Sequence, residues 1–268
     1  QCLFPTPCPS LKCDHREFID ILDTAAKIPG VKKVFVRSGV RYDYLLLEKD
    51  ERTLTALAKN HISGQLKIAP EHVVPKVLKQ MGKPPVEVYD TFCEKYKRVN
   101  ESLGLKQYVV PYFISSHPGC DTASAIRLAQ YMHEHGIRPR QVQDFYPTPG
   151  TLSTCMFYTG QNPLTGETVF VPRDPRQKAA QRALMQYFLP QNRELVTKAL
   201  REAGREDLIG AGKHCLIYEP HPAKKPAASE HKGRNGRHTA SPSKRDASAK
   251  REQGAGKKLQ TCGKKRKK

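Results

Sequence analysis

Four short apolar segments, each followed by a polar turn with proline or glycine, alternate with stretches of helical periodicity through the first 150 residues. The apolar segments predict strands at residues 34–47, 65–72, 107–120 and 141–150. The resulting order, β-α-β-α-β-α-β, is typical of an α/β fold with a parallel sheet or barrel. Ligands of such folds bind beyond the carboxyl ends of the strands. We therefore expect the functional site at the polar strand ends.

The stretches between these segments predict helices with recognisable starts and stops. Asp14 can cap a helix that ends at Pro29-Gly30, and a short helix is expected around Leu54–Ala58. A longer helix around residues 89–103 should stop at Gly104, and one around residues 128–132 should stop at Gly136.

The pattern changes at Thr151, so we expect three parts. Residues 1–150 would form the α/β part and residues 151–220 a small C-terminal subdomain, with a β-hairpin at 157–173 and helices at 175–188 and 190–203. Residues 221–268 hold almost no core-forming side chains and are expected to be a disordered basic tail.

Charge is concentrated in that tail. Residues 222–268 hold about 16 Lys and Arg against about 3 Asp and Glu, roughly +13 of the net charge of +20. Such a tail could bind RNA or DNA nonspecifically by counterion release, although it lacks interleaved aromatic residues, and a solubilising extension is the alternative.

The cysteines suggest a second kind of site. Cys2, Cys8 and Cys13, with His15 close by, could hold zinc or iron-sulfur, or they could be inert thiols in a proline-rich loop. The sequence has neither an 18-residue apolar stretch nor a signal-peptide pattern, so we expect no membrane span and a cytoplasmic location with reduced thiols.

Three strand-end motifs resemble the later strands of a radical S-adenosylmethionine (SAM) barrel. They are LKIAPEHVVPKVLKQMGKP, YFISSHPGCD and DFYPTPGTLST. Their order, together with QCLFPTPCPSLKCDH and the C-terminal segment, is similar to the YgiQ-type family over about residues 1–218. The resemblance implies strands three to six of a partial, TIM-like barrel.

One feature of radical SAM enzymes is missing, because the chain contains no C-x3-C-x2-C motif for a 4Fe-4S cluster. The resemblance implies that the cluster ligands lie upstream, in an N-terminal half of the barrel that would be this chain's main partner. The intact protein would use the cluster and SAM to form a 5′-deoxyadenosyl radical on an unidentified substrate. This chain would be a C-terminal fragment, inactive alone.

The same resemblance implies that residues at the strand ends contact SAM. The candidates follow the first three predicted strands and are Arg37, Ser38, Arg41, Lys67, Glu71, Ser115 and His117. Each has a structural alternative: surface ion pairs for the arginines, a mutual ion pair for Lys67 and Glu71, and a capping or core role for His117.

The last predicted strand ends in Asp144, Tyr146 and Thr148, which would face the substrate unless they serve only the loop. Two other readings of the whole chain remain open. One is an α/β protein that binds nucleic acid through its basic tail, and the other is a zinc-stabilised interaction module using Cys2, Cys8 and Cys13.

Overall fold

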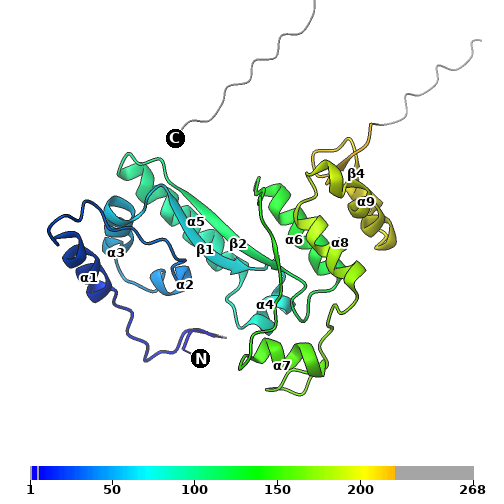
Figure 1. Ribbon diagram of the computed structural model, residues 1–268, viewed down its shortest axis with the longest axis horizontal. Helices are drawn as coiled ribbons and strands as arrows, with labels where there is room; N and C mark the ends of the chain where they lie inside the picture. The colour runs from blue at the N-terminus through cyan, green and yellow to red at the C-terminus, as the bar shows by residue number, and fades with distance from the viewer. Residues whose placement is uncertain (1, 5, 221–268) are drawn as a thin grey trace, which may run out of the picture. The chain divides into compact units, whose positions relative to one another are not determined.

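A three-stranded parallel sheet in the order β1-β2-β3 forms the centre of the protein, as seen in a computed structural model that describes residues 2–4 and 6–220. The strands are β1 (Gln65–Glu71), β2 (Tyr108–Ser115) and β3 (Gln143–Asp144). Helices α4 (Pro75–Met81) and α5 (Val86–Ser102) connect β1 to β2, and α6 (Thr122–Glu134) connects β2 to β3 (Figure 1). The predicted α/β alternation with parallel strands is confirmed.

Shorter elements lie on either side of the sheet in sequence. The N-terminal ones are α1 (Arg16–Ala26), α2 (Tyr42–Leu45), α3 (Arg52–Ala56) and the π-helical turn η1 (Leu57–His61). The C-terminal ones are α7 (Leu152–Thr159), α8 (Pro175–Met185), η2 (Pro190–Asn192), α9 (Arg193–Glu202), η3 (Glu206–Leu208) and the small parallel pair β4 (Ile209–Gly210) and β5 (Ile217–Tyr218).

The helices form where the sequence places an apolar stripe and a cap. In α5 the buried residues Tyr89, Phe92, Tyr96 and Val99 recur at helical spacing, and Gly104 follows with a left-handed φ of 65°. In α6 the Asp121 side chain caps the first turn by accepting the Ser124 N–H. The predicted helices around 89–103 and 128–132, and those in 175–203, are confirmed.

The predicted strand at 34–47 is wrong. Residues 31–41 are irregular and extended, with the Val36 N–H donating to His61 O (2.9 Å) and the Val40 N–H to Lys67 O (3.3 Å), and α2 follows. The segment lies beside β1 but builds no ladder. Tyr42 and Leu45 are both buried in the core. Residues three apart lie on the same side of a helical turn but on opposite faces of a strand, so this segment forms a helix.

Two further expectations need correction. The last strand pairs over two residues only, since Pro147 and Pro149 lack the N–H groups that a longer ladder requires. The expected hairpin at 157–173 begins inside α7 and keeps a single antiparallel bridge, Gln161 with Thr168. The expected tail at 221–268 lies outside the described residues.

One face of the sheet is packed against helices. Leu66, Ile68 and Phe113 join Phe92 of α5 and Met132 of α6 in the main core. Burial of one such side chain stabilises the fold by about 1.5–3 kcal/mol. A second core lies between α6, α8 and α9.

The other face, which we call the open sheet face, carries Gln65, Lys67, Tyr108, Tyr112 and Gln143. Hydrogen bonds join Gln65 Nε2 to Tyr108 Oη (2.6 Å) and Tyr112 Oη to Gln143 Oε1 (2.6 Å) across it. Tyr108 remains 56% and Tyr112 41% exposed. Parallel sheets are normally covered on both faces, so this face lacks its cover within residues 2–4 and 6–220. Those residues form no closed barrel.

No helix in the described ranges has the length and apolar character that a membrane span requires.

Candidate functional site

The ends of β1 and β2 hold the backbone outliers of the described chain. Glu71 (φ 66°) and Ser116 (φ 62°) are its two non-glycine residues with left-handed backbone. This conformation costs an L-residue roughly 1–2 kcal/mol. Strain of this kind collects at binding and catalytic sites, so adjacent strand ends that both carry it form a candidate site.

At the end of β1, Glu71 pairs with Lys83, which follows α4. The Glu71 Oε1–Lys83 Nζ distance is 3.1 Å, and Lys83 Nζ also donates to Ala69 O (3.2 Å). The predicted pair of Lys67 with Glu71 is wrong. A bulge between Ile68 and Glu71 shifts the register, and Lys67 is exposed on the open sheet face.

Two further polar groups, Arg41 and Tyr112, lie close enough to Glu71 for its charge to affect their pKa values. Arg41 binds the Asp43 carboxylate through Nε (2.9 Å) and Nη2 (2.6 Å), which raises the Arg41 pKa, and Glu71 adds to that rise. Burial and then Glu71 raise the pKa of Tyr112. We call Arg41, Glu71, Lys83 and Tyr112 the strand-end polar group.

The other candidates from the first segment, Arg37 and Ser38, are exposed and make no side-chain hydrogen bond or ion pair within the described part of the chain.

At the end of β2, Ser115 bonds to β3 and, through Asp144, is linked to α8. Its hydroxyl donates to Asp144 Oδ1 (2.5 Å), and Asp144 also pairs with Arg182 of α8. Ser115 is buried and alternates away from Tyr112, so it faces the helices and not the open sheet face. The structure therefore does not bring Ser115 and Lys67 to one surface.

Behind this strand end lies a buried polar cluster of His72, Ser116, His117, Cys120 and Gln181. The Val74 N–H donates to His72 Nδ1 (3.1 Å), and His72 Nε2 lies 3.4 Å from Cys120 Sγ. Burial lowers the pKa of His72 to about 3 and of His117 to about 4, and raises that of the Cys120 thiol to about 12. At neutral pH the cluster is uncharged, and Cys120 is a poor nucleophile.

His117 connects this cluster to α7. Its Nδ1 lies 2.7 Å from Pro118 O, its Nε2 lies 2.8 Å from Ser153 Oγ, and its ring packs edge-on against Phe145. Both ring nitrogens are thus engaged inside the protein. The remaining predicted residues, Tyr146 and Thr148, are exposed on the loop that follows.

Ser116→Gly is expected to stabilise the protein by about 1 kcal/mol. Glycine adopts the left-handed backbone without strain, and the buried Ser116 hydroxyl has no hydrogen-bond partner among the described residues. Urea denaturation would measure the change. Ser124→Gly, in α6, should instead destabilise, because Ser124 is helical and its hydroxyl donates to Asp121. A destabilised Ser116→Gly would show that the hydroxyl has a partner after all.

The predicted thiol site lies at the other end of the described chain. Cys2 and Cys8 are exposed, and Cys8 and Cys13 line a hollow of about 680 Å³ beside Glu48. His15 Nδ1 lies 2.6 Å from Glu48 Oε1. Among residues 2–4 and 6–220 no three His, Cys, Asp or Glu side chains are placed to hold a metal ion. Metal binding by Cys2, Cys8 and Cys13 stays a prediction.

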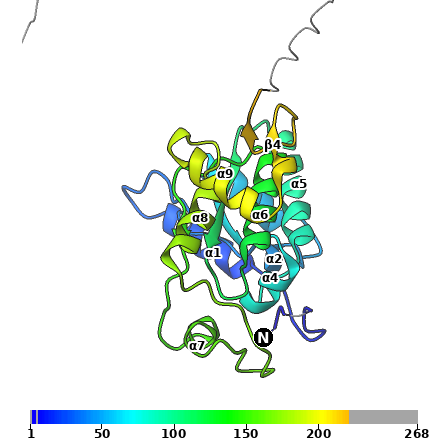
Figure 2. The same cartoon turned by 90° about the vertical axis from the view of Figure 1, so that its right-hand side faces the viewer.

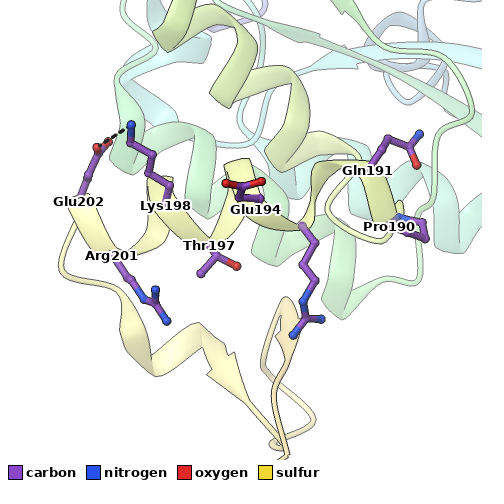
Figure 3. Close-up of a pocket in the computed structure, with 8 residues that line it drawn as sticks. Pro190, Gln191, Glu194, Thr197, Lys198, Arg201 and Glu202 are labelled. Atoms are coloured by element: carbon purple, nitrogen blue, oxygen red, sulfur yellow. Dashed lines mark ion pairs between the residues drawn. The ribbon is translucent and has the colours of Figure 1, made fainter.

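A second hollow, of about 800 Å³, lies along the outer side of α9 (Figure 3). Glu194, Thr197 and Arg201 line it, and Lys198 pairs there with Glu202 at 3.8 Å. No residue that the sequence suggested as functional lies in it. Its side chains come from η2 and α9, which are adjacent in sequence, and belong to a solvated face.

Comparison with known proteins identifies homologues for most of the chain. Residues 140–268 match the family model DUF3362, a domain of unknown function. A UPF0313 protein of Clostridium perfringens (strain 13 / Type A) is 54% identical over 219 residues, which cover 82% of this chain and 33% of that protein. A UPF0313 protein of Clostridium botulinum (strain 657 / Type Ba4) is 54% identical over 217 residues, 81% of this chain and 34% of that protein.

The chain therefore spans about a third of the length of these curated relatives. UPF0313 is the YgiQ-type family, so the homologues agree with the family that the strand-end motifs resemble.

Proposed function

We propose that this chain is part of a YgiQ-type radical SAM protein, in which its strands form one side of a partial barrel and its strand-end polar group contacts SAM. The homology to UPF0313 proteins over 82% of the chain supports the family. The open sheet face is the main observation that supports a barrel, because it leaves one side of the sheet uncovered. In this proposal the remaining strands, and the cysteines that hold the cluster, come from the part of the relatives that this chain does not cover.

A barrel interior explains the unusual composition of the open sheet face. Helices α5 and α6 cover one side of the sheet, as they do outside a barrel, while the other side presents Lys67, Tyr108 and Tyr112. An exposed sheet face with tyrosines joined by hydrogen bonds to glutamines is suited to a polar, enclosed space. The strands end at the strand-end polar group, where barrel enzymes bind their ligands.

The residues present suit SAM but not the cluster. The sequence has no C-x3-C-x2-C motif, and the described residues hold no three-ligand metal group. SAM offers a carboxylate, an ammonium group and ribose hydroxyls. Arg41 and Lys83 would face the carboxylate, and the Glu71 carboxylate would accept from the ammonium group or a ribose hydroxyl. The Tyr112 hydroxyl, 2.6 Å from Gln143 Oε1, would orient the ligand from the sheet side.

In this proposal the cluster would supply the electron for reductive cleavage of SAM, and the strand-end polar group would hold and orient SAM. Ser115 and His117 would act from behind, by fixing the strand end, because their polar atoms are engaged by Asp144, Pro118 and Ser153. Tyr146 and Thr148 would face the substrate, whose identity the proposal leaves open.

Glu71→Gln is expected to weaken SAM binding about 5- to 150-fold, the equivalent of about 1–3 kcal/mol for a lost hydrogen bond to a charged group. The test protein is a full-length UPF0313 protein of Clostridium perfringens in which the matching 219 residues are exchanged for those of this chain. Calorimetric titration with SAM under anaerobic conditions measures the affinity. Iron content should stay unchanged, because Glu71 holds no iron in this proposal.

Glu101→Gln is the matched control. Glu101 is an exposed carboxylate on α5 whose ion pair is with Lys97 of the same helix. It should leave SAM affinity as it was. If Glu71→Gln lowers the melting temperature while SAM affinity stays at the control value, the pair with Lys83 is structural and the site assignment fails. A chimera with a full cluster that forms no 5′-deoxyadenosine from SAM and dithionite would contradict the radical SAM proposal itself.

A further inference from the structure

The segment from Phe145 to Arg173 projects beyond the carboxyl ends of the strands and carries α7 (Figures 1 and 2). The three most exposed large hydrophobic side chains of the described residues all lie in it. They are Tyr146 (76% exposed), Leu164 (73%) and Tyr158 (67%). Exposed large hydrophobic side chains mark an interaction surface where they form one contiguous patch.

Hydrogen bonds fix this segment to the strand ends. The Gly119 N–H donates to Phe170 O (2.7 Å), Asn162 Nδ2 donates to Gln80 Oε1 of α4 (2.8 Å), and His117 bonds Ser153 of α7. The backbone of this segment is therefore held in place, while the side chains of Tyr146 and Tyr158 remain exposed.

Two cations lie against the aromatic rings of this segment. Lys178 Nζ is 5.2 Å from the centroid of the Phe157 ring, and the Arg173 guanidinium is 5.9 Å from it. Arg173 Nη2 also donates to the carbonyls of Phe157 and Tyr158 (2.9 and 2.8 Å). The ring centroids of Phe157 and Tyr158 are 5.3 Å apart, and the ring of Phe145, the residue before Tyr146, lies 5.9 Å from that of Phe157. We call Tyr146, Phe157, Tyr158, Arg173 and Lys178 the α7 aromatic patch.

Two of three acidic groups near the patch form ion pairs, and the third, Asp174, only accepts a backbone N–H. Glu167 pairs with Lys79 (3.8 Å), Asp144 pairs with Arg182, and Asp174 accepts the Arg176 N–H (2.8 Å) as the cap of α8. Lys178 and Arg176 make no ion pair within residues 2–4 and 6–220. An anionic ligand would meet two cations without ion pairs there, beside one carboxylate, Asp174, whose only partner in the described ranges is the N–H that it caps.

We propose that the α7 aromatic patch binds single-stranded nucleic acid, with bases stacked on Tyr146 and Tyr158 and phosphates next to Lys178 and Arg176. Aromatic platforms flanked by cations are the common means of holding unpaired strands, because every base has a stackable face. Lysine is depleted in protein-protein interfaces, whereas here Lys178 lies over the central Phe157 ring. This binding does not depend on SAM or on the cluster.

The double variant Tyr146→Ala/Tyr158→Ala of the full 268-residue chain should bind a 12-nucleotide single-stranded RNA at least about fivefold more weakly than the wild type, the lower end of what one stacked base contributes. Fluorescence anisotropy with a labelled strand measures the affinity, and the DNA strand of the same sequence distinguishes the two sugars. Affinity for the RNA duplex should not change, because residues 222–268, which carry most of the net charge, remain intact. Tyr146→Phe/Tyr158→Phe should bind as the wild type does, since phenylalanine keeps the stacking face.

Tyr218→Ala provides the control, because Tyr218 is equally exposed (65%) but lies on β5, outside the patch. It should not alter single-strand affinity. Equal loss of affinity in Tyr218→Ala would assign the binding to general surface effects and overturn the proposal. Unchanged single-strand affinity in the double alanine variant would overturn it as well. If that variant instead loses self-association while its single-strand affinity stays the same, the patch is a protein contact and the proposal is wrong.

Discussion

Lowering the pH from 7 to 4 should remove about 6 kcal/mol of the folding free energy through two imidazoles alone, about 3 kcal/mol from each. His72 and His117 are buried, and burial holds their pKa values at about 3 and about 4. In the unfolded chain they titrate near 6.5, so between pH 6.5 and pH 4 the unfolded state binds more protons. Stability from these groups is complete above pH 6.5 and is lost as the pH falls.

The surroundings of His72 explain why its pKa is lowered. Desolvation is the largest cause, and the neighbouring His117 and Lys76 further disfavour a second positive charge. The Asp121 carboxylate acts in the opposite sense but is already paired with Lys76 at 2.6 Å. A typical domain has only about 5–15 kcal/mol of stability, so this loss removes a large part of it by pH 4.

Urea denaturation at pH 7, 6, 5 and 4 measures this loss. His72→Asn keeps an oxygen that can accept the Val74 N–H but cannot be protonated, so its stability should fall less steeply with acid than that of the wild type. Replacement of His214, whose ring is exposed, by Asn should leave the steep dependence in place. Parallel pH curves for the wild type and His72→Asn would show that His72 is not the group responsible.

The sequence predicted best what depends on local periodicity. The α5 stripe of Phe92, Tyr96 and Val99 and the stop at Gly104 are local, and both are found in the structure. The strand predicted at 65–72 is found as β1, one residue shorter, and ends at Glu71. The strand predicted at 34–47 does not form, because the alternation of apolar and polar residues is interrupted at Ser38-Gly39. There the backbone passes close to Lys67 and then turns into α2.

The site was predicted as a place but not as a set of contacts. A mutual ion pair was the structural alternative for Lys67 and Glu71, but Glu71 pairs with Lys83, beyond the bulge in β1. Asp144 was expected to face the substrate, but it forms an ion pair with Arg182 of α8, which is 38 residues away in sequence. No pattern along the chain encodes such pairings, because they depend on how α8 packs on the sheet.

Gln181→Met should cost about 2–6 kcal/mol of folding free energy, although helix periodicity alone gives no reason to regard Gln181 as important. Gln181 lies on the buried side of α8, where Oε1 accepts the Ser116 N–H (2.9 Å) and Nε2 donates to Cys120 O (2.8 Å). Methionine fills a similar volume but satisfies neither backbone group. Each unpaired buried group costs about 1–3 kcal/mol, and the two costs fall on the same strand-end loop.

Gln177→Met, on the exposed side of the same helix, separates this effect from a change in helix propensity. Urea denaturation of the two variants should show a loss in Gln181→Met and a change within about 0.5 kcal/mol in Gln177→Met, as is usual for surface positions. Amide hydrogen exchange should also become faster at Ser116, whose N–H loses its acceptor, before the sheet itself opens. If exchange at Ser116 stays as slow as in the wild type, another group has replaced the amide, and α8 does not hold the left-handed end of β2 in the way that its contacts indicate.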